Sequence, residues 1–283
     1  MSQSELEKAK RIIRFFHPEK RFGFMPGAND TEALARIFGV SQQNYLSIRE
    51  EFELNVNLTA RELLNEVDYM RSLKTITLPA GSKIAVIGDS LTDDYQSWFE
   101  IIAKSFAIAR PELELQWINT ALSGDTTMQL FSTLTQIEKL KPDYLFCLIG
   151  TNDGRIHGAG EKSCTGFREV IDNLSEIASR ALSSVVKQFI WLTPVGVKEE
   201  WIKQDWLLNQ FCASWSNKQI LETAELIRTR PEKHIDIAPL FAGERSETMF
   251  LEDGLHWSLQ GQKAVARTVM SGFSQILRSK IHD

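Results

Sequence analysis

The chain has 283 residues, of which 43% are hydrophobic and 24% are charged, and its formal net charge is -5. This length predicts one large α/β domain and a smaller unit beside it, and the apolar content is enough for a sizeable core. The net negative charge argues against the broad basic surface that nucleic-acid binding usually needs. The three cysteines are an odd number without paired spacing, which argues against a disulfide framework and a zinc site.

The N-terminal residues mix acidic and basic side chains and lack the continuous apolar stretch of a secretory signal. No apolar run of transmembrane length follows anywhere in the chain. We therefore expect a soluble, cytoplasmic protein without a membrane span.

Residues 4–74 have apolar side chains at three- and four-residue spacing, which predicts helices throughout. Pro79 and Gly81 then interrupt the pattern. We place a domain boundary here, with an N-terminal helical domain at residues 1–80 and a second domain at residues 81–283.

Short β-rich runs alternate with longer helical patterns after this boundary. The predicted strands are KIAVIG, ELQWIN, DYLFCLIG, QFIWLTP and HIDIAPL, and a long helical region separates the last two. Nearly continuous apolar strands joined by helices are typical of a parallel sheet covered on both faces. The second domain is thus predicted to be a doubly wound α/β domain.

Polar residues follow these strands where each one ends. Ser90 comes after the first strand, Gly124 after the second and Asn152 after the third, while Asp253 and His256 precede the final helix. In doubly wound sheets the carboxyl ends of the strands form the site. We therefore expect these five residues to lie together.

This set has the parts needed for acyl transfer by a serine. Ser90 is the predicted nucleophile, His256 the base, and Asp253 the group that orients the base. The Ser90 and Gly124 backbone amides and the Asn152 side chain are the predicted oxyanion donors. At Gly124, a Cβ would crowd the carbonyl that its amide must approach.

Four short blocks in this order resemble the SGNH subgroup of the GDSL-type esterases and lipases: Gly88-Asp89-Ser90-Leu91-Thr92, Ser123-Gly124-Asp125-Thr126, Gly150-Thr151-Asn152-Asp153 and Asp253-Gly254-Leu255-His256. The resemblance covers residue 83 to the C-terminus. It implies a flavodoxin-like three-layer sandwich and the hydrolysis of carboxylic esters, with thioesters and O-acetyl groups as further candidates, through an acyl-serine intermediate. The implied substrates are small-molecule, glycan or lipid esters, and no metal or organic cofactor is required.

Several nearby residues compete for roles in this site. His157 follows the Asn152 loop and is the main alternative base. The carboxylate of Asp89 is expected to accept hydrogen bonds from backbone amides of the Ser90 loop and so hold Ser90 in place. Trp257, beside His256, is expected to shape the substrate pocket. Trp201, Trp206 and Trp215 have helical spacing and are expected to belong to the core.

A second functional hypothesis concerns residues 31–49, which resemble a helix-turn-helix with Gly39 at the turn. Gln42, Gln43 and Asn44 would then face base edges, and the hydrolase fold would be non-catalytic. Residues 1–80 hold eleven basic and eleven acidic side chains, so the phosphate-neutralising charge that drives DNA binding is missing. The alternative roles for this region are packing on the hydrolase domain, forming the substrate rim, or self-association.

Overall fold

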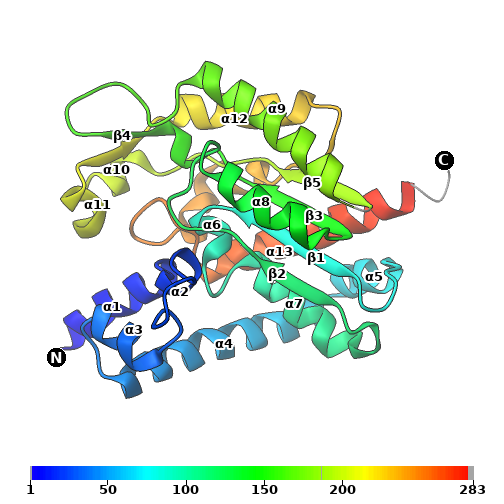
Figure 1. Cartoon of the computed structure of the whole chain (residues 1–283), viewed down its shortest axis with the longest axis horizontal. Helices are drawn as coiled ribbons and strands as arrows, with labels where there is room; N and C mark the ends of the chain where they lie inside the picture. The colour runs from blue at the N-terminus through cyan, green and yellow to red at the C-terminus, as the bar shows by residue number, and fades with distance from the viewer. Residues whose placement is uncertain (1, 186, 280–283) are drawn as a thin grey trace.

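The computed structural model describes residues 2–185 and 187–279 and has a five-stranded parallel β-sheet at its centre (Figure 1). The strand order is β2-β1-β3-β5-β7. The bounds are Lys83–Gly88 (β1), Gln116–Asn119 (β2), Tyr144–Leu148 (β3), Gln188–Leu192 (β5) and Lys233–Ile235 (β7). Each strand overlaps one of the five apolar runs, so the predicted doubly wound α/β sheet is confirmed.

Helices precede, separate and follow these strands. The α-helices are α1 (Gln3–Phe15), α2 (Pro18–Arg21), α3 (Thr31–Ile37), α4 (Gln42–Leu64), α5 (Val67–Thr75), α6 (Ser90–Asp93), α7 (Trp98–Ala109), α8 (Leu130–Leu140), α9 (Phe167–Ser184), α10 (Glu199–Ile202), α11 (Trp206–Gln210), α12 (Asn217–Thr229) and α13 (Leu259–Ser279). Short 3₁₀ turns are η1 (Pro111–Leu113), η2 (Asn152–Gly154), η3 (Ala238–Phe241) and η4 (Glu244–Met249). No helix within the described ranges combines the length and the apolar character needed to cross a membrane.

The predicted long helical region before β7 is wrong in one respect. A short strand, β6 (Ala213–Trp215), interrupts it and pairs antiparallel with β4 (Arg155–His157). Cys212, just before β6, has a φ of 44° and therefore turns the chain out of the helical conformation. The resulting two-stranded ribbon lies beside the loop that carries Asn152.

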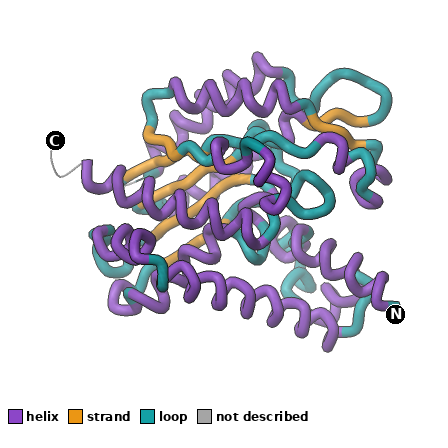
Figure 2. Tube along the Cα trace, turned by 180° about the vertical axis from the view of Figure 1, so that it is seen from behind, coloured by secondary structure: helices purple, strands orange, loops and turns teal. Residues whose placement is uncertain are grey.

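Alternating side chains of the strands face two separate apolar layers, as the two-residue period of a strand requires. Ile84 and Val86 of β1 pack with α7 and α13, whereas Ala85 and Ile87 pack with α8 and α9. Figures 1 and 2 show helices on both sides of the sheet. The result is a three-layer sandwich.

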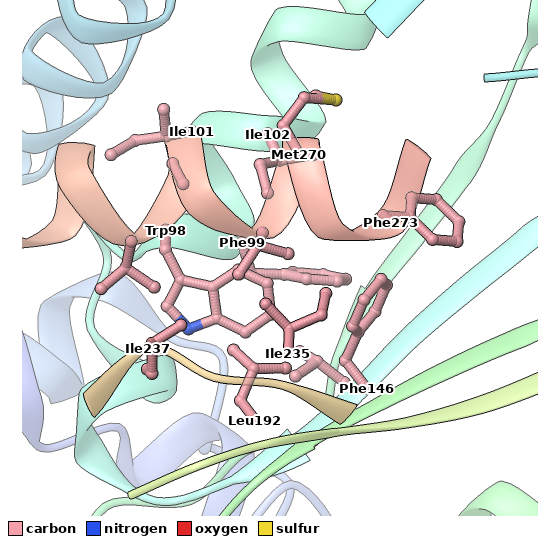
Figure 3. Packing of buried hydrophobic residues seen from close by; sticks show 14 of the residues in the cluster. Trp98, Phe99, Ile101, Ile102, Phe146, Leu192, Ile235, Ile237, Met270 and Phe273 are labelled. Atoms are coloured by element: carbon pink, nitrogen blue, oxygen red, sulfur yellow. The ribbon is translucent and has the colours of Figure 1, made fainter. Parts of the chain in front are cut away.

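Trp98, at the start of α7, lies at the centre of the larger layer (Figure 3). Its side chain is fully buried and makes edge contacts with Phe99 and Phe146. The indole Nε1 donates a hydrogen bond to Thr92 Oγ1 at 3.2 Å. Because Thr92 lies in α6, this contact connects the core to the turn that carries Ser90.

The N-terminal helices pack onto the α7 and α13 side of the sandwich. Leu63 of α4 and Leu73 of α5 are fully buried in the same apolar cluster as the sheet residues. Tyr69 Oη donates a hydrogen bond to Ser105 Oγ of α7 at 3.0 Å. Packing on the α/β domain, one of the roles considered for this region, is therefore observed, while the domain boundary at residue 80 stays a prediction.

Helices α3 and α4 meet at a turn that contains Gly39, whose φ is 69°. Tyr45 and Ile48 of α4 are buried against residues of α1 and α3 in a separate apolar cluster. Gln42 donates a hydrogen bond to Thr31 Oγ1 at 2.8 Å. None of these contacts tests DNA binding, which stays a prediction.

The strand order places a topological switch point at β1. From β1 the chain passes to β2 on one side of it, and it later enters β3 on the other side. Ligands of doubly wound sheets bind in the crevice that such a reversal creates beyond the strand ends. The residues after β1 are therefore at the position where a binding site is expected.

Candidate active site

The turn after β1 presents Ser90 through close backbone packing and a helix cap. A Cβ at Gly88 would lie 2.4 Å from the carbonyl oxygen of Leu148, so only glycine lets β1 approach β3 this closely. Asp89 caps α6, and its Oδ1 accepts a hydrogen bond from the Leu91 amide at 3.0 Å. Ser90 is then the first residue of α6.

Ser90, His256 and Asp253 form a continuous chain of hydrogen bonds. His256 Nε2 lies 3.0 Å from Ser90 Oγ, and His256 Nδ1 lies 2.8 Å from Asp253 Oδ2. An ionised carboxylate can only accept, so the Nδ1–H group donates to Asp253 and Nε2 accepts from the serine hydroxyl. In this tautomer Nε2 can receive the proton of Ser90.

The Asp253 carboxylate is fixed by three hydrogen bonds within its own loop. Oδ1 accepts from the amides of Leu255 and His256 at 2.9 and 2.8 Å, while Oδ2 accepts from the imidazole. Burial raises the pKa of Asp253, but His256, Arg11 and the His256 amide outweigh that effect and lower the pKa to about 2. Asp253 is therefore ionised throughout the neutral pH range.

The three predicted oxyanion donors retain unused hydrogen-bonding capacity within the described residues. The Asn152 amide nitrogen has two hydrogens, and one of them is used by the carbonyl oxygen of Asp125 at 3.1 Å. The backbone amides of Ser90 and Gly124 donate no hydrogen bond to another residue of the described ranges. Their role as oxyanion donors stays a prediction.

Gly124 has a conformational reason to be glycine that differs from the expected one. Its φ is 85°, a region that side chains with a Cβ rarely adopt. A Cβ there would meet only Arg155 Nη1, at 3.8 Å, among the described residues, so the expected crowding of a substrate carbonyl stays a prediction. The loop geometry after β2 therefore requires glycine at this position.

Asp93 of α6 connects the Ser90 turn to the Gly124 loop. Its Oδ2 accepts hydrogen bonds from the amide and the hydroxyl of Ser123, at 2.8 and 2.9 Å. Arg21 of α2 donates to the Ser123 carbonyl and to Asp125 Oδ1, at 3.0 and 2.7 Å. These contacts hold the residue before Gly124 and the residue after it.

Asp89 is buried and only half of its carboxylate is hydrogen-bonded. Oδ2 has no partner among the described residues. Burial, partly opposed by the Leu91 amide, raises the pKa of Asp89 to about 7, and repulsion from Asp153, Asp125 and Asp93 adds to the rise. Oδ1 has the expected structural role of accepting from a loop amide. Oδ2 is buried without a partner, so a negative charge on Asp89 is unfavourable at this position.

Helix α1 lies directly over the His256 loop. The Phe15 ring stacks on the His256 imidazole, with 3.9 Å between ring centroids and 21° between ring planes. Arg11 Nη2 lies 3.1 Å from Asp253 Oδ2. Arg14 donates to the carbonyl oxygen of Trp257 at 3.1 Å. These three residues were not indicated by the sequence, because nothing in the local pattern of α1 distinguishes them from those of an ordinary amphipathic helix.

The competing histidine and one expected pocket residue lie elsewhere. His157 is exposed, and its Nδ1 lies 3.1 Å from the carbonyl oxygen of Phe211. Trp257 is fully buried and stacks on Phe241, with 4.7 Å between ring centroids. The expectation that Trp257 shapes the substrate pocket is therefore wrong, and Phe15 occupies the position beside the imidazole.

Trp215 is buried as expected, whereas Trp201 and Trp206 are half-buried and line a cavity of about 980 Å³. Asp253 and Arg11 line this cavity, whereas Ser90 and His256 do not.

Within residues 2–185 and 187–279, no group of three or more His, Cys, Asp or Glu side chains is arranged to hold a metal ion.

Comparison with known proteins identifies the family. Residues 86–264 match the model of the GDSL-like Lipase/Acylhydrolase family. The chain belongs to this family. It is accordingly a carboxylic ester hydrolase of the SGNH type, as the four sequence blocks predicted. A comparison of the sequence with curated proteins gave no significant match.

Solved structures support the same fold at low sequence identity. LAE5, an alpha/beta hydrolase enzyme from the metagenome of Lake Arreo, Spain, is 20% identical with a TM-score of 0.53, and the match covers 69% of this chain and 96% of LAE5. Axe2, an acetylxylan esterase from Geobacillus stearothermophilus, is 19% identical with a TM-score of 0.52, and the match covers 70% of this chain and 96% of Axe2. At these identities the similarity is one of fold.

Proposed function

We propose that this hydrolase cleaves carboxylic esters through an acyl-serine intermediate on Ser90. The observation that carries the proposal is the chain of hydrogen bonds from Ser90 Oγ through His256 to Asp253. A serine hydroxyl hydrogen-bonded to an imidazole that a carboxylate orients is the arrangement that nucleophilic acyl transfer requires, and it supports the proposal.

In the first half-reaction His256 Nε2 removes the hydroxyl proton while Ser90 Oγ attacks the ester carbonyl carbon. The carbonyl oxygen becomes an oxyanion, which the Ser90 amide, the Gly124 amide and the Asn152 side chain stabilise. Asp253 stabilises the imidazolium that forms. His256 then gives its proton to the leaving alcohol, and the acyl group remains on Ser90.

Water completes the cycle by the same route. His256 removes a proton from water, the resulting hydroxide attacks the acyl-serine, and the oxyanion forms again in contact with the same donors. Collapse of this intermediate returns the proton to Ser90 Oγ and releases the acid. Every proton transfer uses a group already present in the chain.

The same three residue types carry catalytic mutations in the neighbouring acetylxylan esterase, with the same spacing between the aspartate and the histidine. Variants of Axe2 at a serine, at an aspartate and at a histidine three positions after that aspartate are each described as catalytic mutants. Asp253 and His256 are also three positions apart. This correspondence supports the proposed roles of Ser90, Asp253 and His256.

The substrates we propose are esters of short acyl groups, including O-acetyl groups on sugars. Ser90 is 6% exposed and His256 is 8% exposed, and Phe15 covers one face of the imidazole. Such limited access favours a small acyl group over a long chain. Thioesters with the same acyl groups would use the same donors and are a second class to assay.

The test is covalent labelling with a serine-reactive fluorophosphonate, followed by intact-mass measurement of wild type and Ser90→Ala. We expect one phosphonyl group on wild type and none on Ser90→Ala. Ser132→Ala, which alters a serine on helix α8, serves as the matched control and should still be labelled. Labelling of folded Ser90→Ala would show that another residue is the nucleophile.

A further inference from the structure

Residues outside the matched family region contact the proposed triad. The family match begins at residue 86, whereas Arg11, Arg14 and Phe15 belong to α1. Positions 11 and 15 are four apart and therefore lie on the same face of the helix. This face lies against Asp253 and His256.

Arg11 contacts the same carboxylate oxygen that accepts from His256. Asp253 Oδ2 is 2.8 Å from His256 Nδ1 and 3.1 Å from Arg11 Nη2. The side chain of Asp253 is fully buried and that of Arg11 is 18% exposed. A cation at this distance and burial competes with the imidazolium for the negative charge of Asp253.

A second carboxylate holds Arg11 in this position. Asp205 accepts two hydrogen bonds from the guanidinium, at 2.5 and 2.9 Å, and its Oδ1 also accepts from the amides of Leu207 and Leu208. Asp205 is thereby fixed as the cap of α11. The planar guanidinium can bridge two such carboxylates, whereas a lysine ammonium would provide only a point charge.

The other charged groups near this pair do not replace Arg11. Glu252 interacts electrostatically with Arg11 and adds negative charge beside Asp253. Arg14 is engaged by Asp94, with hydrogen bonds of 2.9 and 2.6 Å, and by the Trp257 carbonyl. Phe15 and Ser90 are the neutral neighbours of the imidazole.

We propose that Arg11 is a positioning residue that balances part of the charge of Asp253 and so sets the pH at which the proposed Ser90–His256–Asp253 triad becomes active. The inference rests on the proposed roles of Asp253 and His256. Without Arg11, the full charge of Asp253 would favour the imidazolium, which cannot accept the proton of Ser90. The N-terminal helix thus contributes to catalysis without touching the substrate.

The experiment measures kcat/KM for 4-nitrophenyl acetate between pH 5 and 9 with full-length wild type, Arg11→Gln and Arg11→Lys. We expect Arg11→Gln to move the midpoint of the acidic limb upward by about 1 pH unit. Below the midpoint, this shift corresponds to a roughly tenfold loss of kcat/KM, with a smaller loss at high pH. Arg11→Lys should recover part of the shift.

Lys10→Gln is the matched control, because Lys10 is the adjacent cation of α1 and pairs with Glu51, whereas no ion pair or hydrogen bond between Lys10 and Asp253 is found among the described residues. Its midpoint should equal that of wild type. If Arg11→Gln does not fold, Arg11→Gln/Asp205→Asn removes both members of the pair, and the same upward shift is expected.

An unchanged midpoint in a folded Arg11 variant would overturn the inference while leaving the ester hydrolysis of wild type intact. Failure of the proposed function has a different signature, in which folded wild type neither turns over esters nor reacts with the fluorophosphonate. A uniform loss of kcat/KM at all pH values, equal in Arg11→Gln and Arg11→Lys, would assign Arg11 a purely structural role and also overturn the inference.

Discussion

Replacement of Asn152 by alanine tests the proposed oxyanion site most directly. The side chain is 3% exposed, and its amide nitrogen has one hydrogen bonded to the Asp125 carbonyl and one available for a substrate oxygen. Loss of one oxyanion donor costs about 2.7–4 kcal/mol of transition-state stabilisation, or roughly 10²- to 10³-fold in kcat. KM should change little, because the donor acts mainly on charge that develops in the transition state.

The structural cost of Asn152→Ala should be much smaller than its catalytic cost. Loss of the hydrogen bond to Asp125 is worth about 1 kcal/mol of folding stability. In a chain of this size that loss lowers Tm by roughly 2–4 °C. Thermal unfolding followed by circular dichroism therefore separates the two effects.

Asn173→Ala is the matched control. Asn173 is also a buried asparagine, and it donates a hydrogen bond to Thr127 Oγ1 at 2.9 Å without belonging to the proposed oxyanion donors. Steady-state kinetics with 4-nitrophenyl acetate should give a similar stability loss in the two variants and a large kcat loss in Asn152→Ala alone. A loss of kcat below about fivefold, or an equal loss in both variants, would refute the assignment of Asn152 as a donor.

Three further predictions follow from the buried groups around Ser90. Asp253→Asn should reduce kcat by about 10⁴-fold, because the amide no longer selects the productive tautomer of His256 or stabilises the imidazolium; steady-state kinetics measures this, and near-normal turnover would exclude the role. The pKa of Asp89 is raised from an ordinary 3.8 to about 7, so the folded state binds this proton more tightly than the unfolded state, and the contribution of Asp89 to stability falls as pH rises from about 4 to about 7. Asp89→Asn should therefore stabilise the protein more at pH 8 than at pH 5 in urea unfolding. A stability difference that is the same at both pH values would contradict the reasoning. Trp98→Phe should lower the free energy of unfolding by about 1–3 kcal/mol, since it leaves a void in the core and removes the hydrogen bond to Thr92; a loss below about 0.5 kcal/mol in urea unfolding would mean that the core repacks fully.

The sheet could be predicted because its strands are strong local signals. Runs such as Lys83–Gly88 and Tyr144–Leu148 are almost entirely apolar, and both become strands buried on two faces. The order of the strand ends along the chain then indicated where the polar residues would meet. Ser90 and His256, 166 positions apart, are accordingly within hydrogen-bond distance.

The part of the site that the sequence did not indicate depends on packing between distant segments. Arg11 and Asp205 are separated by 194 positions, and no periodicity relates them. The same limit explains the error at Trp257. Its neighbour His256 is hydrogen-bonded to Ser90, whereas the fully buried Trp257 packs on Phe241 in the core, and nothing in the local sequence indicates this difference in direction.

The N-terminal segment also stabilises the turn that carries Ser90, independently of what Arg11 does. Asp93 and Asp94 follow Ser90 closely and are buried, and both receive their cationic partners from that segment. Arg14 forms two hydrogen bonds with Asp94, while His17 Nδ1 lies 2.7 Å from Asp93 Oδ1 and Lys20 also binds this oxygen.

Removal of these partners would leave two uncompensated buried carboxylates beside the proposed nucleophile, at a cost of roughly 3–5 kcal/mol for each broken pair. Asp93 would at the same time lose the fixed position from which it binds Ser123, the residue before Gly124. The Ser90 turn and the Gly124 loop therefore depend on residues 14–20 for their relative placement. The region matched by the family model, residues 86–264, contains the proposed catalytic groups, but the charge balance that holds them in place includes the N-terminal helices.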